Sequence, residues 1–221
     1  MLISLLTGFT AGAIHVIAGA DHMVAIAPYA IRRPRLALKQ GLAWGVGHST
    51  GVLILASIAV LAKDLVNIEK LSSFAEFLVG VTLLVVGTIA IRSSLGLNIH
   101  NHNHQHGVGR EHKHMHLHFS GGEFHSRHAH ASTSLGILHG MAGASHLLAV
   151  LPALALPAMG AIAYMGAYLM GSIISMCSFV LGISLTSKKI GSRLSPLLMG
   201  TTGGLSIATG VFWLHKSPFF S

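Results

Sequence analysis

Six long apolar runs constrain the fold of this chain more than any other feature. They cover residues 1–29, 38–62, 72–93, 133–157, 160–186 and 196–215. Each is close to the roughly 20 residues that an α-helix needs to cross about 30 Å of hydrocarbon. Charged residues make up only 9% of the chain, against roughly 25% in an ordinary soluble domain. We therefore expect an all-α membrane protein with six transmembrane helices.

The start of the chain and its cysteine content add two expectations. The Ala18-Gly19-Ala20 string resembles a signal-peptide cleavage site, but no Lys or Arg precedes Arg32. Because the positive n-region is missing, we expect the first run to remain as a membrane helix. The single cysteine, Cys177, lies within a run, so neither an internal disulfide nor a cysteine-rich zinc site is expected.

Most basic residues lie on one side of the expected membrane. Of the fourteen Lys and Arg residues, eleven follow the first, third or fifth run, and Lys63, Lys70 and Lys216 lie on the other side. An excess of basic residues marks the cytoplasmic side of membrane proteins. We expect a multi-pass integral membrane protein, in the cell inner membrane if the host is bacterial, with both termini outside and a long cytoplasmic central loop. The bilayer, rather than nucleic acid, then accounts for the net charge of +8.

The sequence repeats itself after 124 residues, because residues 15–28 return as residues 139–152 with two histidines, an Ala-Gly-Ala string and a proline in register. Weaker matches at nearly the same offset pair Ala43, Trp44 and Gly47 with Ala167, Tyr168 and Gly171, and Leu71, Ser72, Gly80 and Gly87 with Leu194, Ser195, Gly203 and Gly210. We therefore predict two three-helix repeats, residues 1–93 and 133–221, on either side of a loop at 94–132. Three helices per repeat would place the two copies in opposite orientations across the membrane.

Histidines within the apolar runs point to metal chemistry, because they are costly in hydrocarbon unless they bind something. A straight helix would hold His15 and His22 roughly 10 Å apart along its axis. We expect the helix to unwind at Ala18-Gly19-Ala20 and bring them together, and to end at Pro28. Neutral imidazoles with a carboxylate suit divalent Ni, Co, Zn, Mn or Fe. The predicted ligands are His15, Asp21, His22, His48, His139 and His146.

The first repeat carries more potential ligands than the second. At the repeat offset Asp21 becomes Ser145 and His48 becomes Ser172, so we expect an asymmetric site. Two alternatives remain for these histidines, which are simple hydrogen bonding between helices and a proton relay.

The central loop is rich in histidine. Eleven of the seventeen histidines lie between His100 and His130, mostly in alternation with other residues. This alternation resembles a strand, but the glycines and polar content favour a flexible, low-complexity segment. Such a segment binds several metal ions weakly and would act as a buffer, sensor or hand-over surface, or as an inert linker. The predicted weak sites are His102, His104, His106, His112, His114, His116 and His118.

Two elements of the sequence resemble the nickel/cobalt transporter family. That family carries a His and an Asp-His pair in one membrane helix and a Gly-His-Ser/Thr element in another, similar to His15, Asp21-His22 and residues 47–50 here. The similarity is greater to a branch that includes plant organelle proteins regarded as high-affinity nickel transporters. Positions shared with that branch are His15, Gly19, Asp21, His22, Ala25, Ala27, Pro28, His139, Gly140 and residues 150–157. The resemblance implies membrane transport of Ni²⁺ or Co²⁺, with His15, Asp21, His22 and His48 as ligands.

The leading hypothesis is a secondary transporter, or permease, for nickel or cobalt. The ion would be the transported substrate, with no tightly bound cofactor. No nucleotide-binding Gly-x4-Gly-Lys-Ser/Thr string is present, so an ion gradient, the membrane potential or a separate partner would supply the energy. The alternatives are an exporter of the same ions and a membrane accessory protein that delivers nickel to urease or hydrogenase assembly, with a cytoplasmic nickel chaperone as a possible partner. An enzyme is not expected, because no nucleophile or substrate pocket is visible.

Overall fold

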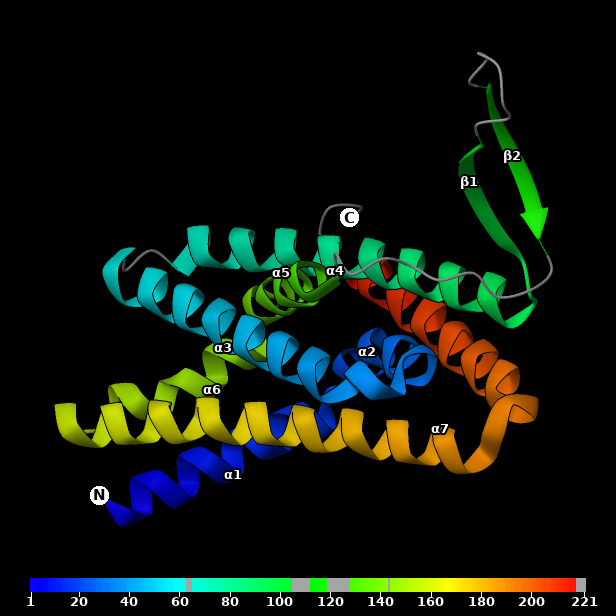
Figure 1. The fold of residues 1–221 in the computed structure, drawn as a ribbon. Helices are drawn as coiled ribbons and strands as arrows, with labels where there is room; N and C mark the ends of the chain where they lie inside the picture. The colour runs from blue at the N-terminus through cyan, green and yellow to red at the C-terminus, as the bar shows by residue number, and fades with distance from the viewer. Residues whose placement is uncertain (63–64, 105–111, 119–127, 143, 218–221) are drawn as a thin grey trace.

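Apart from one hairpin, the chain folds into helices (Figure 1). The computed structural model describes residues 1–62, 65–104, 112–118, 128–142 and 144–217. In chain order the elements are α1 (Leu2–Ala18), α2 (Ala20–Arg32), the 3-10 helix η1 (Pro34–Leu36), α3 (Ala37–Ala62), α4 (Leu65–Ser94), β1 (Asn98–His104), β2 (His112–His118), α5 (His128–Met141), α6 (Ala144–Leu154) and α7 (Ala158–Lys216).

Four helical segments in the described part of the chain are long and apolar enough to cross a membrane. They are Pro34–Ile58, Lys70–Ser94, Ala158–Gly191 and Leu194–Lys216. The last two belong to α7, which bends at Gly191, where φ is +75° and glycine is favoured. This bend agrees with the boundary expected between the last two apolar runs. The lengths and compositions indicate a multi-pass membrane protein.

The first apolar run forms a broken helix, as the Ala-Gly-Ala string predicts. α1 and α2 meet at Gly19 with a bend of 70° and together count as one further span, which brings the total to five. The expected end at Pro28 is wrong, because α2 continues through Pro28 to Arg32. A proline removes one backbone hydrogen bond, and a helix packed among other membrane helices tolerates that loss.

The fourth expected span is divided in the structure. The run at 133–157 forms α5 and α6, with 14 and 11 residues, and each is shorter than the roughly 20 residues of a membrane span. The described residues thus supply four or five candidate spans rather than six. The interruption around Ala142 corresponds to that around Ala18 at the 124-residue offset.

Glycines allow the helices to approach closely. α3 packs against α5, α1 against the first part of α7, and α4 along α7. A side chain at Gly47 would fall on the carbonyl oxygen of Thr133, and one at Gly171 on that of Phe9. Small residues have this role in membrane helices, where van der Waals packing replaces the hydrophobic effect between helices.

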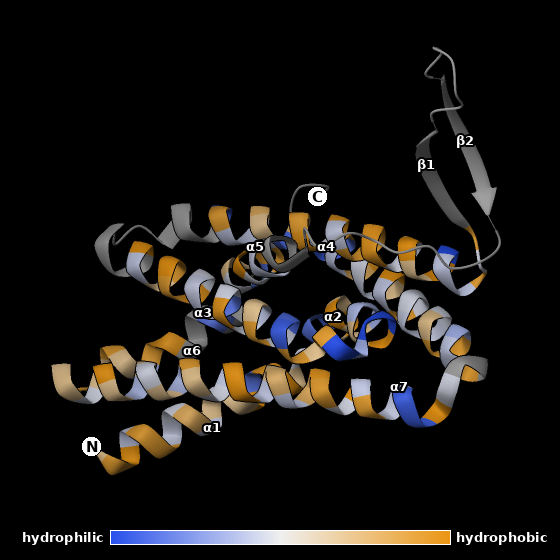
Figure 2. Cartoon of the chain, viewed as in Figure 1, coloured by the Kyte–Doolittle hydropathy of each residue, from blue (hydrophilic) through white to orange (hydrophobic). Residues whose placement is uncertain are grey.

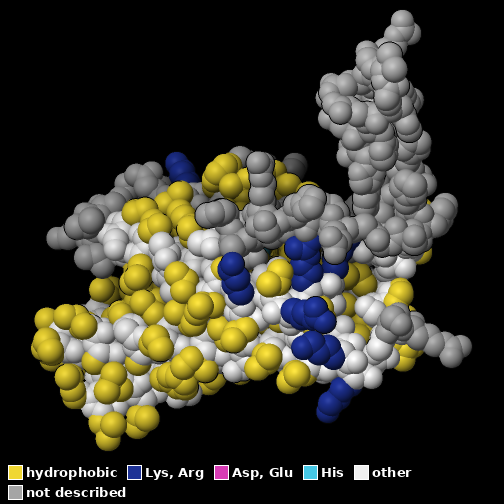
Figure 3. All heavy atoms as spheres, in the orientation of Figure 1, with side chains coloured by type: hydrophobic (Ala, Val, Ile, Leu, Met, Phe, Trp, Pro, Cys, Tyr) yellow, Lys and Arg dark blue, Asp and Glu magenta, His cyan; other side chains and the backbone are white. Residues whose placement is uncertain are grey.

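Large apolar side chains are exposed on the outward faces of the bundle, and hydrophobic residues colour much of the helical ribbon orange in Figure 2. Ile3 is 77% exposed, Ile162 67% and Phe212 62%. Such a surface is stable against lipid and would favour aggregation in water. Figure 3 shows most of the visible Lys and Arg side chains on the half of this face nearer the bend of α7, with hydrophobic side chains prevailing on the other half.

The central loop contains an antiparallel hairpin of β1 and β2. The alternation of histidines therefore predicted its backbone correctly, whereas the flexible segment that we favoured from the composition was wrong for these residues. The register pairs His100 with His116, His102 with His114, and His104 with His112.

The glycine contacts lead to a stability prediction. Gly171→Ala should lower the melting temperature in detergent, because the new methyl group would overlap the Phe9 carbonyl. Overpacking of this kind costs about 1–3 kcal/mol, or roughly 2–4 °C in Tm per kcal/mol at this chain length. Gly182→Ala, in the same helix but with open space at the Cβ position, is the control and should be neutral or stabilising. Equal effects of both changes would contradict the importance of this contact.

Candidate metal centre

Four histidine side chains from four helices converge inside the bundle. They are His15 on α1, His22 on α2, His48 on α3 and His146 on α6. One ring nitrogen from each lies within 4.8 Å of the others, a spacing that could hold a metal ion. His22, His48 and His146 are 1–3% exposed, and His15 is partly buried.

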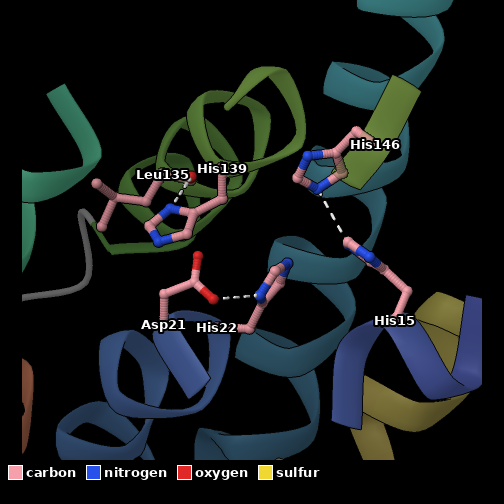
Figure 4. A network of polar contacts seen from close by, with 6 residues as sticks. All are labelled: His15, Asp21, His22, Leu135, His139 and His146. Carbon is pink, nitrogen blue, oxygen red and sulfur yellow. Dashed lines mark hydrogen bonds and ion pairs between the residues drawn. The ribbon is translucent and has the colours of Figure 1, made fainter. Parts of the chain in front are cut away.

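His48 is in contact with the other three rings. Its ring centroid lies 4.8 Å from that of His22, 5.1 Å from that of His146 and 5.4 Å from that of His15. The Nε2 atoms of His15 and His146 are 3.0 Å apart, so one ring donates an N–H to the other (Figure 4). These two residues come from opposite halves of the chain, and only the tertiary structure places them together.

The donor set fits a borderline transition metal. A tetrahedral ion with bonds of about 2.0 Å holds neighbouring nitrogens roughly 3.3 Å apart, which the 3.0 to 4.8 Å spacings here approach with small side-chain movements. Both ring nitrogens of His48 and the Nε2 of His22 are buried without a hydrogen-bond partner among the residues that the structure describes. Buried nitrogens of this kind are costly unless they bind a ligand.

Asp21 orients a histidine in this structure rather than belonging to the four-residue group. The Nδ1–H of His22 donates a hydrogen bond of 3.0 Å to Oδ1 of Asp21, which leaves Nε2 of His22 available to an ion. Carboxylates commonly support metal-binding histidines in this way. Asp21 lies in the first turn of α2, where the helix dipole favours a negative charge.

Gly19 makes this arrangement possible. Its backbone has φ −80° and ψ 91°, so the chain leaves the helical conformation there. A side chain at Gly19 would overlap Nδ1 of His22 and lie 3.2 Å from Oδ1 of Asp21. The break in the helix therefore brings His15 and His22 together, and the missing side chain gives the His22–Asp21 pair its space.

His139 lies next to the four-histidine group but outside it. Its Nδ1–H donates a 3.0 Å hydrogen bond to the carbonyl oxygen of Leu135, and its ring lies 4.8 Å from Trp44 and 5.8 Å from His22. The side chain is 2% exposed. Of the six residues predicted as ligands, four converge, Asp21 supports one of them, and His139 forms a neighbouring position.

The expected asymmetry has a structural counterpart. At the position equivalent to His48 in the second half, the hydroxyl of Ser172 donates a 3.0 Å hydrogen bond to the Tyr168 carbonyl. The serine hydroxyl also lies 3.3 Å from the Gly12 carbonyl oxygen on α1, while the ring nitrogens of His48 have no hydrogen-bond partner among the described residues. The converging histidines therefore come mainly from the first half.

A cavity of about 550 Å³ reaches the site from one side. Its lining includes the broken segment of α1 and α2 and the end of α7, with His15, Asp21, His22, His146, Thr209 and Trp213 among the residues. Six waters occupy about 180 Å³ in the liquid, so a hydrated divalent ion has room. His48 and His139 do not line this cavity.

The loop histidines predicted as weak sites lie in the hairpin or outside the described residues. His106 lies outside the described residues, and for His102, His104, His112, His114, His116 and His118 the structure describes the backbone alone. Their metal binding stays a prediction.

Two aromatic residues at the site, Trp44 and Tyr168, had no predicted role. Trp44 lies against His139, and the ring of Tyr168 is 6.0 Å from that of His15. Trp44 and Tyr168 occupy equivalent positions of the sequence repeat, and this match was the signal that could have identified them.

A multi-pass bundle of apolar helices around a buried histidine group defines a membrane protein with a candidate metal centre. Comparison with known proteins finds distant relatives that agree with this class. The Arabidopsis thaliana chloroplast protein FOR GROWTH AND FERTILITY 2 is 31% identical over 201 residues, which is 87% of this chain and 50% of that protein. FOR GROWTH AND FERTILITY 1 from the same plant is 30% identical, over 99% of this chain and 60% of its own length.

A bacterial relative is matched over more of its length. The urease accessory protein UreH of Bacillus sp. (strain TB-90) is 27% identical over 97% of this chain and 92% of its own length. The chain spans only 50% to 60% of the plant proteins. No protein-family description and no solved structure matches the chain. The expected similarity to plant organelle proteins is confirmed, while membership of the nickel/cobalt transporter family stays a prediction.

The unsatisfied nitrogens of His48 lead to a prediction. His48→Leu should raise the melting temperature of the metal-free protein, because each buried unsatisfied group costs about 1–3 kcal/mol. The same change should abolish the rise in Tm that Ni²⁺ gives the wild type, measured in detergent with EDTA or with Ni²⁺. His215→Leu, at an exposed position, should alter neither value. A metal-free Tm below that of the wild type would show that His48 is a satisfied structural residue.

Proposed function

We propose that this protein is a secondary transporter that moves a divalent transition metal ion, nickel or cobalt, across a membrane. The observation that carries the proposal is the group of four histidines on α1, α2, α3 and α6, three buried and one partly buried, with ring nitrogens within 4.8 Å of one another. Ionisable side chains in a membrane bundle mark ion pathways, and imidazole nitrogens select borderline ions over Ca²⁺ and Mg²⁺.

The proposed ligands are His15, His22, His48 and His146, with Asp21 as the support of His22. Four neutral imidazoles leave the charge of a divalent ion uncompensated, so the carboxylate on the other side of the His22 ring has an electrostatic role as well. The cavity supplies access from one side of the bundle. Together these features provide a pathway into the site and the ligands to remove an ion's hydration shell.

Paired contacts support the proposed inverted three-helix repeats, residues 1–93 and 133–221. Gly47 lies against Thr133 and Gly171 against Phe9, so the second contact repeats the first with the two halves exchanged at an offset of 124. The same exchange relates Trp44 and His139 to Tyr168 and His15. It also relates Gly80 beside Gly210 to Gly203 beside Gly87, at an offset of 123. In this proposal α5 and α6 together form the fourth of six membrane-crossing segments, which is equivalent to α1 and α2.

Helix breaks near the middle of the bilayer are typical of transporters. The carbonyl-bearing C-terminal ends of half-helices commonly help to bind cations there. α1 and α5 both end within four residues of a proposed histidine position, since α1 ends at Ala18 and α5 at Met141. The proposed membrane orientation has both termini outside and the loop 94–132 in the cytoplasm, where the histidine hairpin would buffer or hand over the ion.

A second candidate function is supported by one relative. UreH is named as a urease accessory protein, so this chain could deliver nickel for urease assembly instead of moving it across a membrane. An exporter with the same site is a variant of the first proposal, and it differs in the direction of net flux.

Flux measurements separate these functions. Proteoliposomes of defined orientation should take up radioactive Ni²⁺ or Co²⁺ under an imposed pH gradient, and His22→Ala should remove most of this flux because it deletes a ligand. His104→Ala is the matched control in the loop and should have little effect, since neighbouring histidines replace it. The direction and gradient dependence of the flux distinguish uptake from export. Metal binding without flux in the wild type would favour the accessory function.

The support of His22 by Asp21 gives a further prediction. Asp21→Asn keeps the size of the side chain but removes its charge, and metal affinity should fall about 10- to 100-fold, as for other residues that orient metal ligands. Isothermal titration with Ni²⁺ in detergent measures this, with Glu76→Gln on α4, outside the four-histidine group, as the control. An unchanged affinity would mean that Asp21 neither orients His22 nor contributes charge.

A further inference from the structure

The four-histidine group contains His15 but not His139, its equivalent at the repeat offset. At the repeat offset His15 corresponds to His139, and His22 corresponds to His146. The rings of His15 and His146 are 4.5 Å apart with their Nε2 atoms in hydrogen-bonding contact. The equivalent rings of His139 and His22 are 5.8 Å apart. One of two related histidine pairs is therefore closed in this structure, and the other is more open.

His139 is prepared to bind a metal ion although it lies outside the group. Its Nδ1–H is engaged by the Leu135 carbonyl, so the lone pair of the ring is at Nε2. That Nε2 atom is buried with no hydrogen-bond partner in the described part of the chain. Trp44 packs against the ring and limits its rotation. A purely structural histidine at a buried position would have a hydrogen-bond partner for each of its two ring nitrogens.

Asp21 gives this second position its negative charge. Figure 4 shows the carboxylate of Asp21 between the rings of His22 and His139, with one oxygen bonded to His22 and the other directed to the side of His139. Asp21 is thus next to both the four-histidine group and His139. A carboxylate lowers the cost of a divalent ion in surroundings of low dielectric constant.

Access to the two positions differs. The cavity borders His15, His146, His22 and Asp21 but not His139. An ion that enters from the cavity therefore reaches the four-histidine group directly, and His139 lies on the far side of His22 from His15 and His146 (Figure 4).

From these observations we propose that His139, His22 and Asp21 form a second ion position, in which His139 replaces His15 and His146 as the ion moves on. The proposal rests on the transporter function above. Exchange of the two halves between related conformations would open the His15–His146 pair and close the His22–His139 pair. His22 is common to both positions, so the ion changes its partners one side at a time and keeps a protein ligand throughout.

The test uses one substitution at two equivalent positions of the full chain. In His139→Asn the amide can still donate to the Leu135 carbonyl, but no atom replaces the Nε2 lone pair. In His15→Asn the same change removes a member of the four-histidine group. Each variant is measured for Ni²⁺ affinity by titration in detergent and for Ni²⁺ flux in proteoliposomes.

We expect His139→Asn to bind Ni²⁺ with the wild-type Kd and with the wild-type visible absorption spectrum after Co²⁺ substitution, while its flux falls roughly tenfold or more, as expected for loss of a metal ligand. His15→Asn should lose both binding and flux. Wild-type flux in His139→Asn would overturn the proposal and leave the transporter function intact. Loss of binding in His139→Asn would also overturn it, because His139 would then belong to the first site. An absence of flux in the wild type would instead remove the transporter function, and this inference with it.

Discussion

The structure depends on the high cost of leaving imidazole nitrogens unsatisfied in the interior of a membrane bundle. Away from water each nitrogen needs a hydrogen, a ligand or another ring. His139 satisfies one nitrogen through Leu135, His22 satisfies one through Asp21, and His15 and His146 satisfy each other. The two ring nitrogens of His48 have no hydrogen-bond partner among the described residues. Buried nitrogens without such a partner on His22, His48 and His139 thus lie at or beside the candidate site, where a metal ion would bind them.

Glycine allows this arrangement in two different ways. At Gly19 the chain leaves the helical conformation and offers space to the His22 ring. Elsewhere the role of glycine is close packing, as where Gly136 brings α5 against the backbone of α3 at Trp44 and His48. The first effect orients a histidine, and the second brings the helices close enough for their histidines to meet. The break at Gly19 and the close packing at Gly136 together give the site its geometry.

In the proposed repeat, divergence between the two halves accounts for the asymmetry of the candidate site. The matched segments supply His15 and His22 from one half and His139 and His146 from the other, and the next helices carry His48 or Ser172. The serine hydroxyl donates to the carbonyl oxygens of Tyr168 and Gly12. In the transporter that we propose, an asymmetric set of ligands would let two conformations differ in affinity, so that the ion binds on one side and is released on the other.

The amino-acid pattern was sufficient for the membrane character, the helical class and the break at Gly19, because each depends on local composition or on spacing within one helix, while the histidine ligand set stays a prediction. The end expected at Pro28 was wrong, and residues 133–157 form two short helices instead of one continuous helix, since neighbouring helices decide whether a helix continues past a proline or divides. Spacing could not show that Asp21 would orient His22, or that His15 would pair with His146 and leave His139 apart. Those outcomes depend on distances between helices, which are set by side-chain packing between segments more than a hundred residues apart in the chain.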